Sequence, residues 1–163
     1  MSDNNKSPDM AEIQNLLNLE ARYLNSADFD KWISLYTEDG IYWMPLDSEQ
    51  TDPEAHDSIF YEDRTLMEVR KRNFDHQLSP SMQYPVRSSR IISDVHLHKY
   101  ETDSDTYIIN SSFQAVLFYK EQTVYAGNYQ HHLQVTDSGY KIKLKRVDLL
   151  NADMPLPPIM IYI

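Results

Sequence analysis

The stretch Asp28–Pro45, DFDKWISLYTEDGIYWMP, decides the fold, because it predicts a capped helix that turns directly into a strand. Asp28 has a short carboxylate that accepts from free backbone amides at a helix start. Gly40 suits a left-handed helix end, and the aromatic run Ile41–Met44 is typical of a strand. Apolar residues at helical spacing lie between these signals: Phe29, Trp32, Ile33 and Tyr36. We therefore expect this unit at the centre of the molecule.

Two further helices are expected, one on each side of this unit. Apolar residues recur every three to four positions through Met10–Asn25, which predicts the first helix after a flexible tail at residues 1–9. An acidic loop at Asp47–Asp57 precedes the other, which we expect at Ser58–Phe74.

The second half of the chain changes to alternating apolar and polar residues, beyond a crossing marked by Pro80 and Pro85. Short turns between these segments favour antiparallel pairing. Helices followed by such a meander indicate a single α+β domain at residues 10–163, with the helices on one face of the sheet. The predicted strands are Val86–Tyr100, Thr106–Glu121, Thr123–Val135 and Tyr140–Leu150. The apolar, proline-rich stretch Asn151–Ile163 predicts an interface.

Composition excludes several classes of function. The 163 residues include no cysteine, which rules out disulfides, thiolate metal sites and a cysteine nucleophile. A formal charge of −10 argues against binding to nucleic acid or to anionic membranes. No apolar run approaches the ~20 residues that span a bilayer, and the polar N-terminus is not typical of a signal peptide. We expect a cytoplasmic protein.

Two carboxylates share apolar helix faces, Glu20 in the first helix and Asp63 in the third. Each has two interpretations: an ion pair with an arginine at the rim of the core, or an acid or base in a cavity. The arginines available are Arg22, Arg64, Arg70, Arg87 and Arg90. In the third strand His131 is expected to point inward, bonded to a tyrosine or a carboxylate, and His132 outward. Lys145 in the last strand is expected in solvent.

Metal binding and nucleophilic catalysis find little support. Asp94, His96 and His98 alternate on one strand face, which is a possible metal-ligand pattern. The opposite face carries Ile91, Val95 and Leu97, so the Asp/His face is expected in solvent and no metal site is assigned. No phosphate-binding loop, dinucleotide fingerprint or nucleophile motif occurs.

The order of these elements resembles the cone-shaped fold of nuclear transport factor 2, ketosteroid isomerase and scytalone dehydratase. Within that fold the chain is most similar to the small (β) subunits of aromatic-ring-hydroxylating dioxygenases. The stretches that carry the resemblance are Glu20–Arg22 before Asp28–Trp32, Leu35–Asp39 running into Tyr42–Pro45, Tyr61–Arg64, and Lys145–Leu156. Where such subunits commonly have an arginine-rich strand, this chain has Asn128–His132.

The resemblance implies three helices packed on a curved, mainly antiparallel sheet. It also implies a non-catalytic subunit that supports a large (α) subunit in the degradation of an aromatic compound. That large subunit would hold a Rieske 2Fe-2S cluster and a mononuclear iron, so no cofactor is expected in this chain. Three small subunits would form a homotrimer beneath three large ones, joined through the sheet and the C-terminal segment.

Two alternatives belong to other classes. One is a cone-pocket isomerase or dehydratase for a small cyclic substrate, with Glu20, Asp63 and His131 as pocket candidates. Alignment with the isomerase pattern puts Met44 at the position of the catalytic aspartate and Glu20 at that of the donor tyrosine, and a thioether cannot abstract a proton. Asp63 with His131 would then be the dehydratase-like pair. The other alternative is a scaffold or binding domain without an enzyme partner.

Overall fold

The computed structural model describes residues 7–77 and 86–163, so the crossing at Pro80 and Pro85 and most of the predicted tail lie outside the described residues. The elements in chain order are α1 (Met10–Asn25), α2 (Phe29–Ser34), β1 (Tyr36–Pro45), β2 (Ser58–Asp63), α3 (Arg64–Gln77), β3 (Arg87–Glu101), β4 (Thr106–Tyr119), β5 (Glu121–Thr136) and β6 (Gly139–Leu149). Asp9, which we placed in the tail, caps α1 by accepting from the amides of Ala11 and Glu12.

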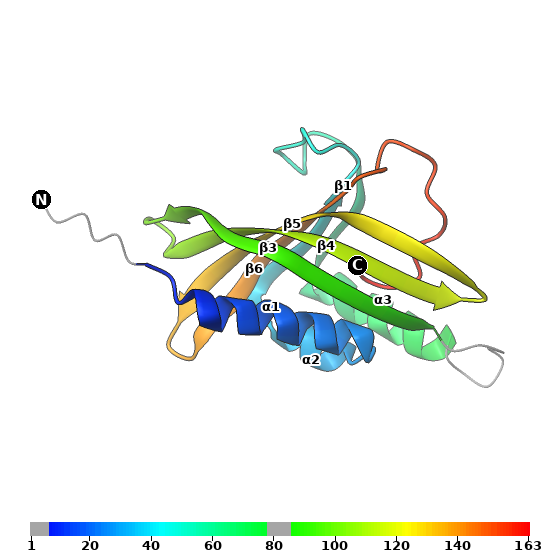
Figure 1. Ribbon diagram of the computed structural model, residues 1–163, viewed down its shortest axis with the longest axis horizontal. Coiled ribbons are helices and arrows are strands. Elements are labelled where there is room, and N and C mark those ends of the chain that lie inside the picture. The colour runs from blue at the N-terminus through cyan, green and yellow to red at the C-terminus, as the bar shows by residue number, and fades with distance from the viewer. Residues whose placement is uncertain (1–6, 78–85) are drawn as a thin grey trace, which may run out of the picture.

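A single curved sheet carries the fold, with strand order β2-β1-β6-β5-β4-β3. β1 runs parallel to β6, and every other neighbouring pair is antiparallel. Figure 1 shows the three helices on one side of this sheet, with α1 against β3 and α3 against β1 and β2. The expected α+β architecture is confirmed. No helix in the described ranges is both long and apolar enough to cross a membrane.

The central unit forms as predicted at its start and differs at its end. Asp28 caps α2, but the helix stops at Ser34, and Tyr36 already pairs with Ile142 in β6. Gly40 therefore lies inside β1 and not at a left-handed helix end. A Cβ atom there would lie 2.8 Å from the Cβ of Tyr36, so the close approach of Tyr36 explains the glycine.

The predicted helix Ser58–Phe74 is wrong in its first third. Ser58–Asp63 is the edge strand β2, which pairs with β1, and the helix begins only at Arg64. Pairing with β1 overrides the weak helical pattern of this short segment. The change of period matters for the site, because it turns Glu62 inward and leaves Asp63 exposed.

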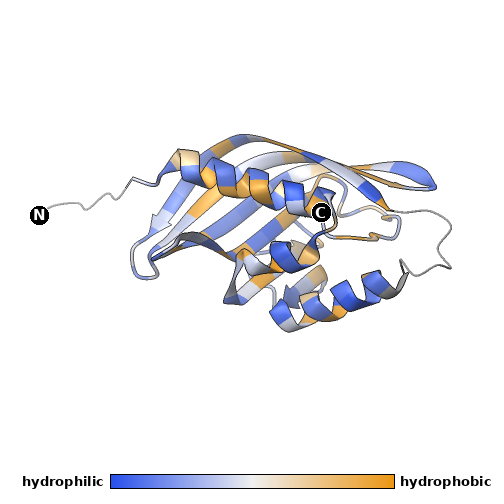
Figure 2. Cartoon of the chain, turned by 90° about the horizontal axis from the view of Figure 1, so that it is seen from below, coloured by the Kyte–Doolittle hydropathy of each residue, from blue (hydrophilic) through white to orange (hydrophobic). Residues whose placement is uncertain are grey.

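The core lies between the helices and the sheet, and Figure 2 shows apolar positions recurring along both. Aromatic rings fill much of it, including Trp32, Tyr42 and Tyr129, each at most 1% exposed. Contrary to expectation, the C-terminal segment is not apolar surface throughout. Ile161–Ile163 is buried in the same core, although Met154 is exposed.

Candidate functional site

A buried ionic cluster around Glu20 lies at the centre of the cone. Glu20 belongs to the buried stripe of α1 and is 1% exposed. Its Oε1 accepts from Trp32 Nε1 at 3.1 Å and from Lys145 Nζ at 2.8 Å. Its Oε2 lies 2.8 Å from His131 Nε2. One carboxylate therefore links α1 to α2, β5 and β6, and no arginine takes part in these bonds.

Lys145 reaches this cluster because β6 contains a bulge. Leu133 pairs with Ile142 and His132 with Leu144, so Lys143 is an extra residue. An extra residue reverses the alternation of the strand beyond it. The expectation that Lys145 faces solvent is thus wrong: its side chain is 1% exposed and its Nζ lies 4.2 Å from the centre of the Tyr129 ring.

The cluster is electrostatically balanced. Burial alone would raise the pKa of Glu20, but the positive charge of Lys145 and the bonds from Lys145 and His131 outweigh burial and hold that pKa below its usual range. Burial lowers the pKa of Lys145, and the Glu20 carboxylate offsets part of this shift. Glu20 is therefore ionised at neutral pH, and both of its oxygens already have partners.

The histidine predictions are confirmed in orientation. His131 is fully buried beside Tyr129 and is bonded to a carboxylate, which is one of the two kinds of partner that we expected. His132 points to the outer face of the sheet, where its Nε2 lies 3.0 Å from Gln130 Oε1. Burial lowers the pKa of His132.

Asp63 does not belong to this site. It is exposed and accepts from the amide of Leu66 at 2.9 Å, so it caps α3, and within the part of the chain that the structure describes it pairs neither with an arginine nor with His131. Its neighbour Glu62 is the buried carboxylate, 6% exposed, and it forms the ion pair with Arg70 that we had considered for Asp63. The dehydratase-like pair of Asp63 and His131 is therefore absent.

Tyr162 closes the interior beside this cluster. Its ring is 2% exposed and lies 4.3 Å from the Trp32 ring and 4.9 Å from the Tyr42 ring, measured between centroids. Its hydroxyl donates to Glu62 Oε2 at 2.6 Å. Met44, at the position of the isomerase base, is fully buried. The rings of Trp32, Tyr42 and Tyr162 thus pack together in the interior of the cone.

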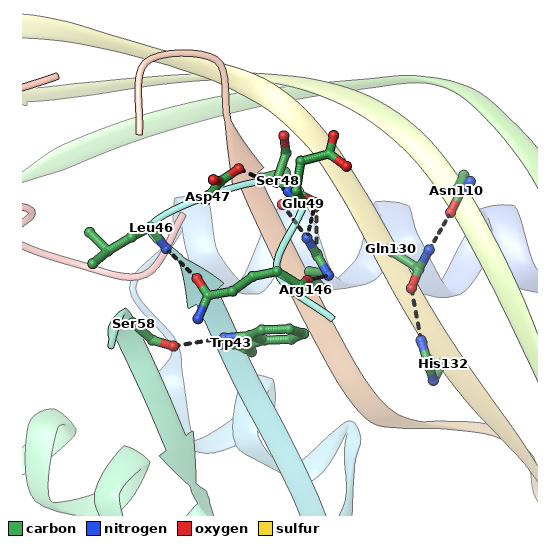
Figure 3. Close-up of polar contacts among 12 residues, drawn as sticks. Trp43, Leu46, Asp47, Ser48, Glu49, Ser58, Asn110, Gln130, His132 and Arg146 are labelled. Carbon is green, nitrogen blue, oxygen red and sulfur yellow. Dashed lines mark hydrogen bonds and ion pairs between the residues drawn. The ribbon is translucent and has the colours of Figure 1, made fainter. Parts of the chain in front are cut away.

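Figure 3 shows two separate groups of polar contacts on the outer face of the sheet, one around Arg146 and one that joins Asn110, Gln130 and His132. Arg146 stacks on Trp43 with its guanidinium carbon 4.6 Å from the ring centroid and donates to the carbonyls of Ser48 and Gln50. It also forms a two-point ion pair with Asp148. These contacts fix the acidic loop onto β6. They explain why Trp43 is buried although it points away from the core.

The Asp/His face of β3 provides no closed metal site. Asp94 has a positive φ of 53° at a bulge, and His96 Nδ1 lies 2.8 Å from the Asp94 carbonyl. Within the described ranges, no group of three or more His, Asp or Glu residues is placed to hold a metal ion. Our assumption about the other face of this edge strand is wrong, because Ile91 and Leu97 are exposed.

Sequence reasoning missed Lys145, Glu62 and Tyr162. For Lys145 the sequence held a signal. The apolar residue Ile142 has an even number, whereas Val147 and Leu149 have odd numbers, and all three are buried. Such a change of phase indicates a bulge. Nothing comparable marks Tyr162, because an irregular segment has no period from which an inward side chain is predicted.

Comparison with known proteins identifies relatives of this chain. The sequence profile described as "Ring hydroxylating beta subunit" matches residues 19–155. The 2-halobenzoate 1,2-dioxygenase small subunit of Burkholderia cepacia is 28% identical over 142 residues, which cover 81% of this chain and 82% of the relative. The crystal structure of the benzoate 1,2-dioxygenase beta subunit from Burkholderia mallei superimposes with a TM-score of 0.77 at 25% identity, covering 96% of this chain and 99% of that one. A scytalone dehydratase-like structure from Novosphingobium aromaticivorans, 13% identical with a TM-score of 0.63, covers 86% of this chain and 83% of that one and shares the cone fold.

Proposed function

Because this chain belongs to the family of ring hydroxylating beta subunits, we propose that it is the non-catalytic small subunit of an aromatic-ring-hydroxylating dioxygenase and supports a large subunit. Its relatives include small subunits of dioxygenases for 2-halobenzoate, toluate and benzoate. The large subunit would then select the aromatic substrate and carry the oxygen chemistry.

The chemistry of the available ligands supports this division of labour. A Rieske cluster needs two cysteines and two histidines, and the sequence has no cysteine. The residues of this chain therefore do not fit that cluster. We assign the Rieske cluster and the mononuclear iron to the partner large subunit.

The filled cone is the observation that carries the non-catalytic role. A general base works best when its pKa lies near the operating pH, and the pKa of Glu20 is held below its ordinary range. Both Glu20 oxygens are bonded, and the rings of Trp32 and Tyr162 occupy the adjoining space. The cluster is then a structural tie between α1, α2, β5 and β6, and its rigidity would serve assembly.

Co-expression with a dioxygenase large subunit encoded next to this chain tests the proposal. A tagged chain should retain the large subunit in a constant ratio, and all iron should be found with the large subunit. The chain purified alone should bind no stoichiometric iron and should turn over no cyclic ketone or alcohol. Iron retained at one atom per chain after dialysis against a weak chelator would contradict the proposal.

We further infer a homotrimer of small subunits in an α3β3 assembly, supported by exposed apolar side chains on the outer face of the sheet. The cytoplasmic location expected from the sequence stays a prediction.

A further inference from the structure

The segment after β6 is bound to the body of the protein by side-chain contacts and not by regular secondary structure. Residues 155–163 form neither a helix nor a strand. Arg90 Nη2 donates to the Tyr162 carbonyl, and the Ile163 amide donates to the Tyr42 hydroxyl at 3.1 Å. Figure 1 shows the segment curling back from the end of β6 toward α3. The last residues are thus held much as a bound peptide is held.

The surroundings of the Tyr162 ring are those of a site for an aromatic ring. Trp32 packs at 4.3 Å with a tilt of 32°, and Tyr42 and Phe29 present their edges at 4.9 Å and 6.0 Å. The Arg70 guanidinium lies 5.8 Å from the centre of the same ring. Edge-to-face rings and a nearby cation are specific in geometry as well as apolar, so this box favours a flat aromatic group.

One end of the box is built to recognise a hydroxyl. Glu62 is 6% exposed, and its Oε2 accepts the Tyr162 hydroxyl at 2.6 Å. Its Oε1 is held by Arg70, whose Nε donates at 2.8 Å. A buried carboxylate fixed on one oxygen and free to accept on the other is a strong acceptor for a phenol O–H.

The carboxylate end of the box also borders the surface. A groove of about 290 Å³ runs between α3 and the C-terminal segment and is lined by Glu62, Arg70, Phe74, Ile159 and Met160 among others. Arg70 is 38% exposed there. A small molecule therefore has a short route to Glu62 once the tyrosine ring is out of the way.

We propose that the interior of the cone is a binding site for para-substituted phenols, which the chain fills with its own Tyr162. The tyrosine side chain is 4-methylphenol on a tether, so free 4-methylphenol is the matching ligand. Because a tethered group has a high effective concentration, the intact chain excludes the free phenol, and removal of the ring opens the site. This assignment is independent of the subunit role, since it concerns the isolated chain.

The test uses full-length Tyr162→Ala with 4-methylphenol and toluene as probes. Toluene has the same ring and methyl group but no hydroxyl. 4-Methylphenol should bind at least about tenfold more tightly than toluene, because hydrogen bonds to ionised groups are the strong ones. It should also raise the melting temperature toward that of the unaltered chain. Calorimetry and thermal unfolding give both quantities.

Matched variants separate this site from a nonspecific cavity. Tyr162→Phe keeps the box filled and should bind neither probe. Tyr36→Ala removes another tyrosine, 2% exposed, whose hydroxyl has no hydrogen-bond partner among the described residues, and this variant should show no preference for the phenol. When Glu62→Gln is added to Tyr162→Ala, the affinity for 4-methylphenol should come closer to the affinity for toluene.

Two results would overturn the proposal. Equal affinity of Tyr162→Ala for toluene and 4-methylphenol would mean an apolar cavity without phenol recognition. If Tyr162→Ala does not fold, 4-methylphenol should restore its native circular dichroism, and it should stabilise the milder variant Tyr162→Leu more than toluene does. If 4-methylphenol neither restores Tyr162→Ala nor stabilises Tyr162→Leu more than toluene does, the site is excluded. Neither outcome tests whether the chain binds a large subunit.

Discussion

Glu20 shows how one charged residue becomes part of a core. Its carboxylate meets an indole N–H, an ammonium group and an imidazole within 3.1 Å. A buried charge persists only when such partners replace water, and loss of one partner leaves the others unpaired. The sequence indicated that Glu20 lies on the buried stripe of α1. It did not indicate the partners, because they come from three other elements.

Replacement of Glu20 by alanine should strongly destabilise the protein. The Lys145 side chain, 1% exposed, would be left buried without a counter-ion, and breaking a buried pair costs about 3–5 kcal/mol. Urea unfolding at pH 7 measures the loss. The exposed loop variant Glu54→Ala is the control and should stay within about 0.5 kcal/mol of the unaltered chain. An unchanged midpoint for Glu20→Ala would contradict the structural role.

The same carboxylate predicts a pH dependence. The pKa of Glu20 is lower in the folded state than its ordinary value of 4.5, so the unfolded chain binds this proton first as the pH falls. The stabilisation is present in full above about pH 5 and is lost progressively below it. Glu20→Gln removes this group, and its unfolding free energy should fall less between pH 6 and pH 3 than that of the unaltered chain. Urea titrations across this range measure the difference. If the unfolding free energies of the variant and the unaltered chain fell by the same amount, the assignment would be refuted.

At the scale of elements, both the local sequence pattern and the pairing between strands determine where helices and strands form. The helix Met10–Asn25 has its predicted bounds, and the four meander strands agree closely with prediction, because long periodic segments carry their own signal. Ser58–Asp63 differs because six residues cannot distinguish a helix from an edge strand without the partner β1. The bulge at Lys143 also depends on pairing with a neighbouring strand, and it changes which residues reach the site. One extra residue exchanged the two faces of β6.

The contact between β5 and β6 should tolerate no side chain at Gly127. A Cβ atom there would lie 1.9 Å from the Asp148 carbonyl oxygen, which belongs to the backbone and cannot rotate away. Gly127→Ala should therefore force the strands apart and destabilise the protein by about 1–3 kcal/mol or more. Thermal unfolding provides the measurement. The neighbouring change Ala126→Gly, on the outer face, should cost about 1 kcal/mol at most, and equal effects of the two variants would argue against the clash.

For the whole molecule, the fold was accessible from sequence and the state of its interior was not. The succession of capped helix, strand, helix and meander specified the cone. Whether the cone is open depends on where Tyr162 points, and this follows from contacts with Arg90, Glu62 and Trp32 far away in the chain. The same contacts change the interpretation of the C-terminal segment. Truncation after Asp153 would remove part of the core, so it cannot test an interface alone.

Self-association is better tested on the outer face of the sheet. Ile91, Phe118, Val124 and Leu150 are exposed there at 67%, 37%, 59% and 75%; we call them the outer apolar patch. In the ladder Ile91 lies opposite Gln114 and Val124 opposite Val116, both on β4, and the Leu150 amide bonds to the Ala126 carbonyl in β5. Exposed apolar side chains grouped in this way mark a surface that another chain covers.

We expect the chain to form a trimer that the double variant Ile91→Asp/Val124→Asp dissociates. In a cyclic assembly every interface is the same, so two charges placed in the patch weaken all contacts of the ring together. Neither side chain contributes to the core, so the unfolding midpoint of the dissociated monomer should change little. Light scattering should give about three times the monomer mass for the unaltered chain and one monomer mass for the variant at micromolar concentration. The control Glu49→Lys/Glu54→Lys changes charge in the exposed loop and should remain trimeric. An unaltered chain that stays monomeric at millimolar concentration would refute self-association and would restrict the patch to contact with the large subunit.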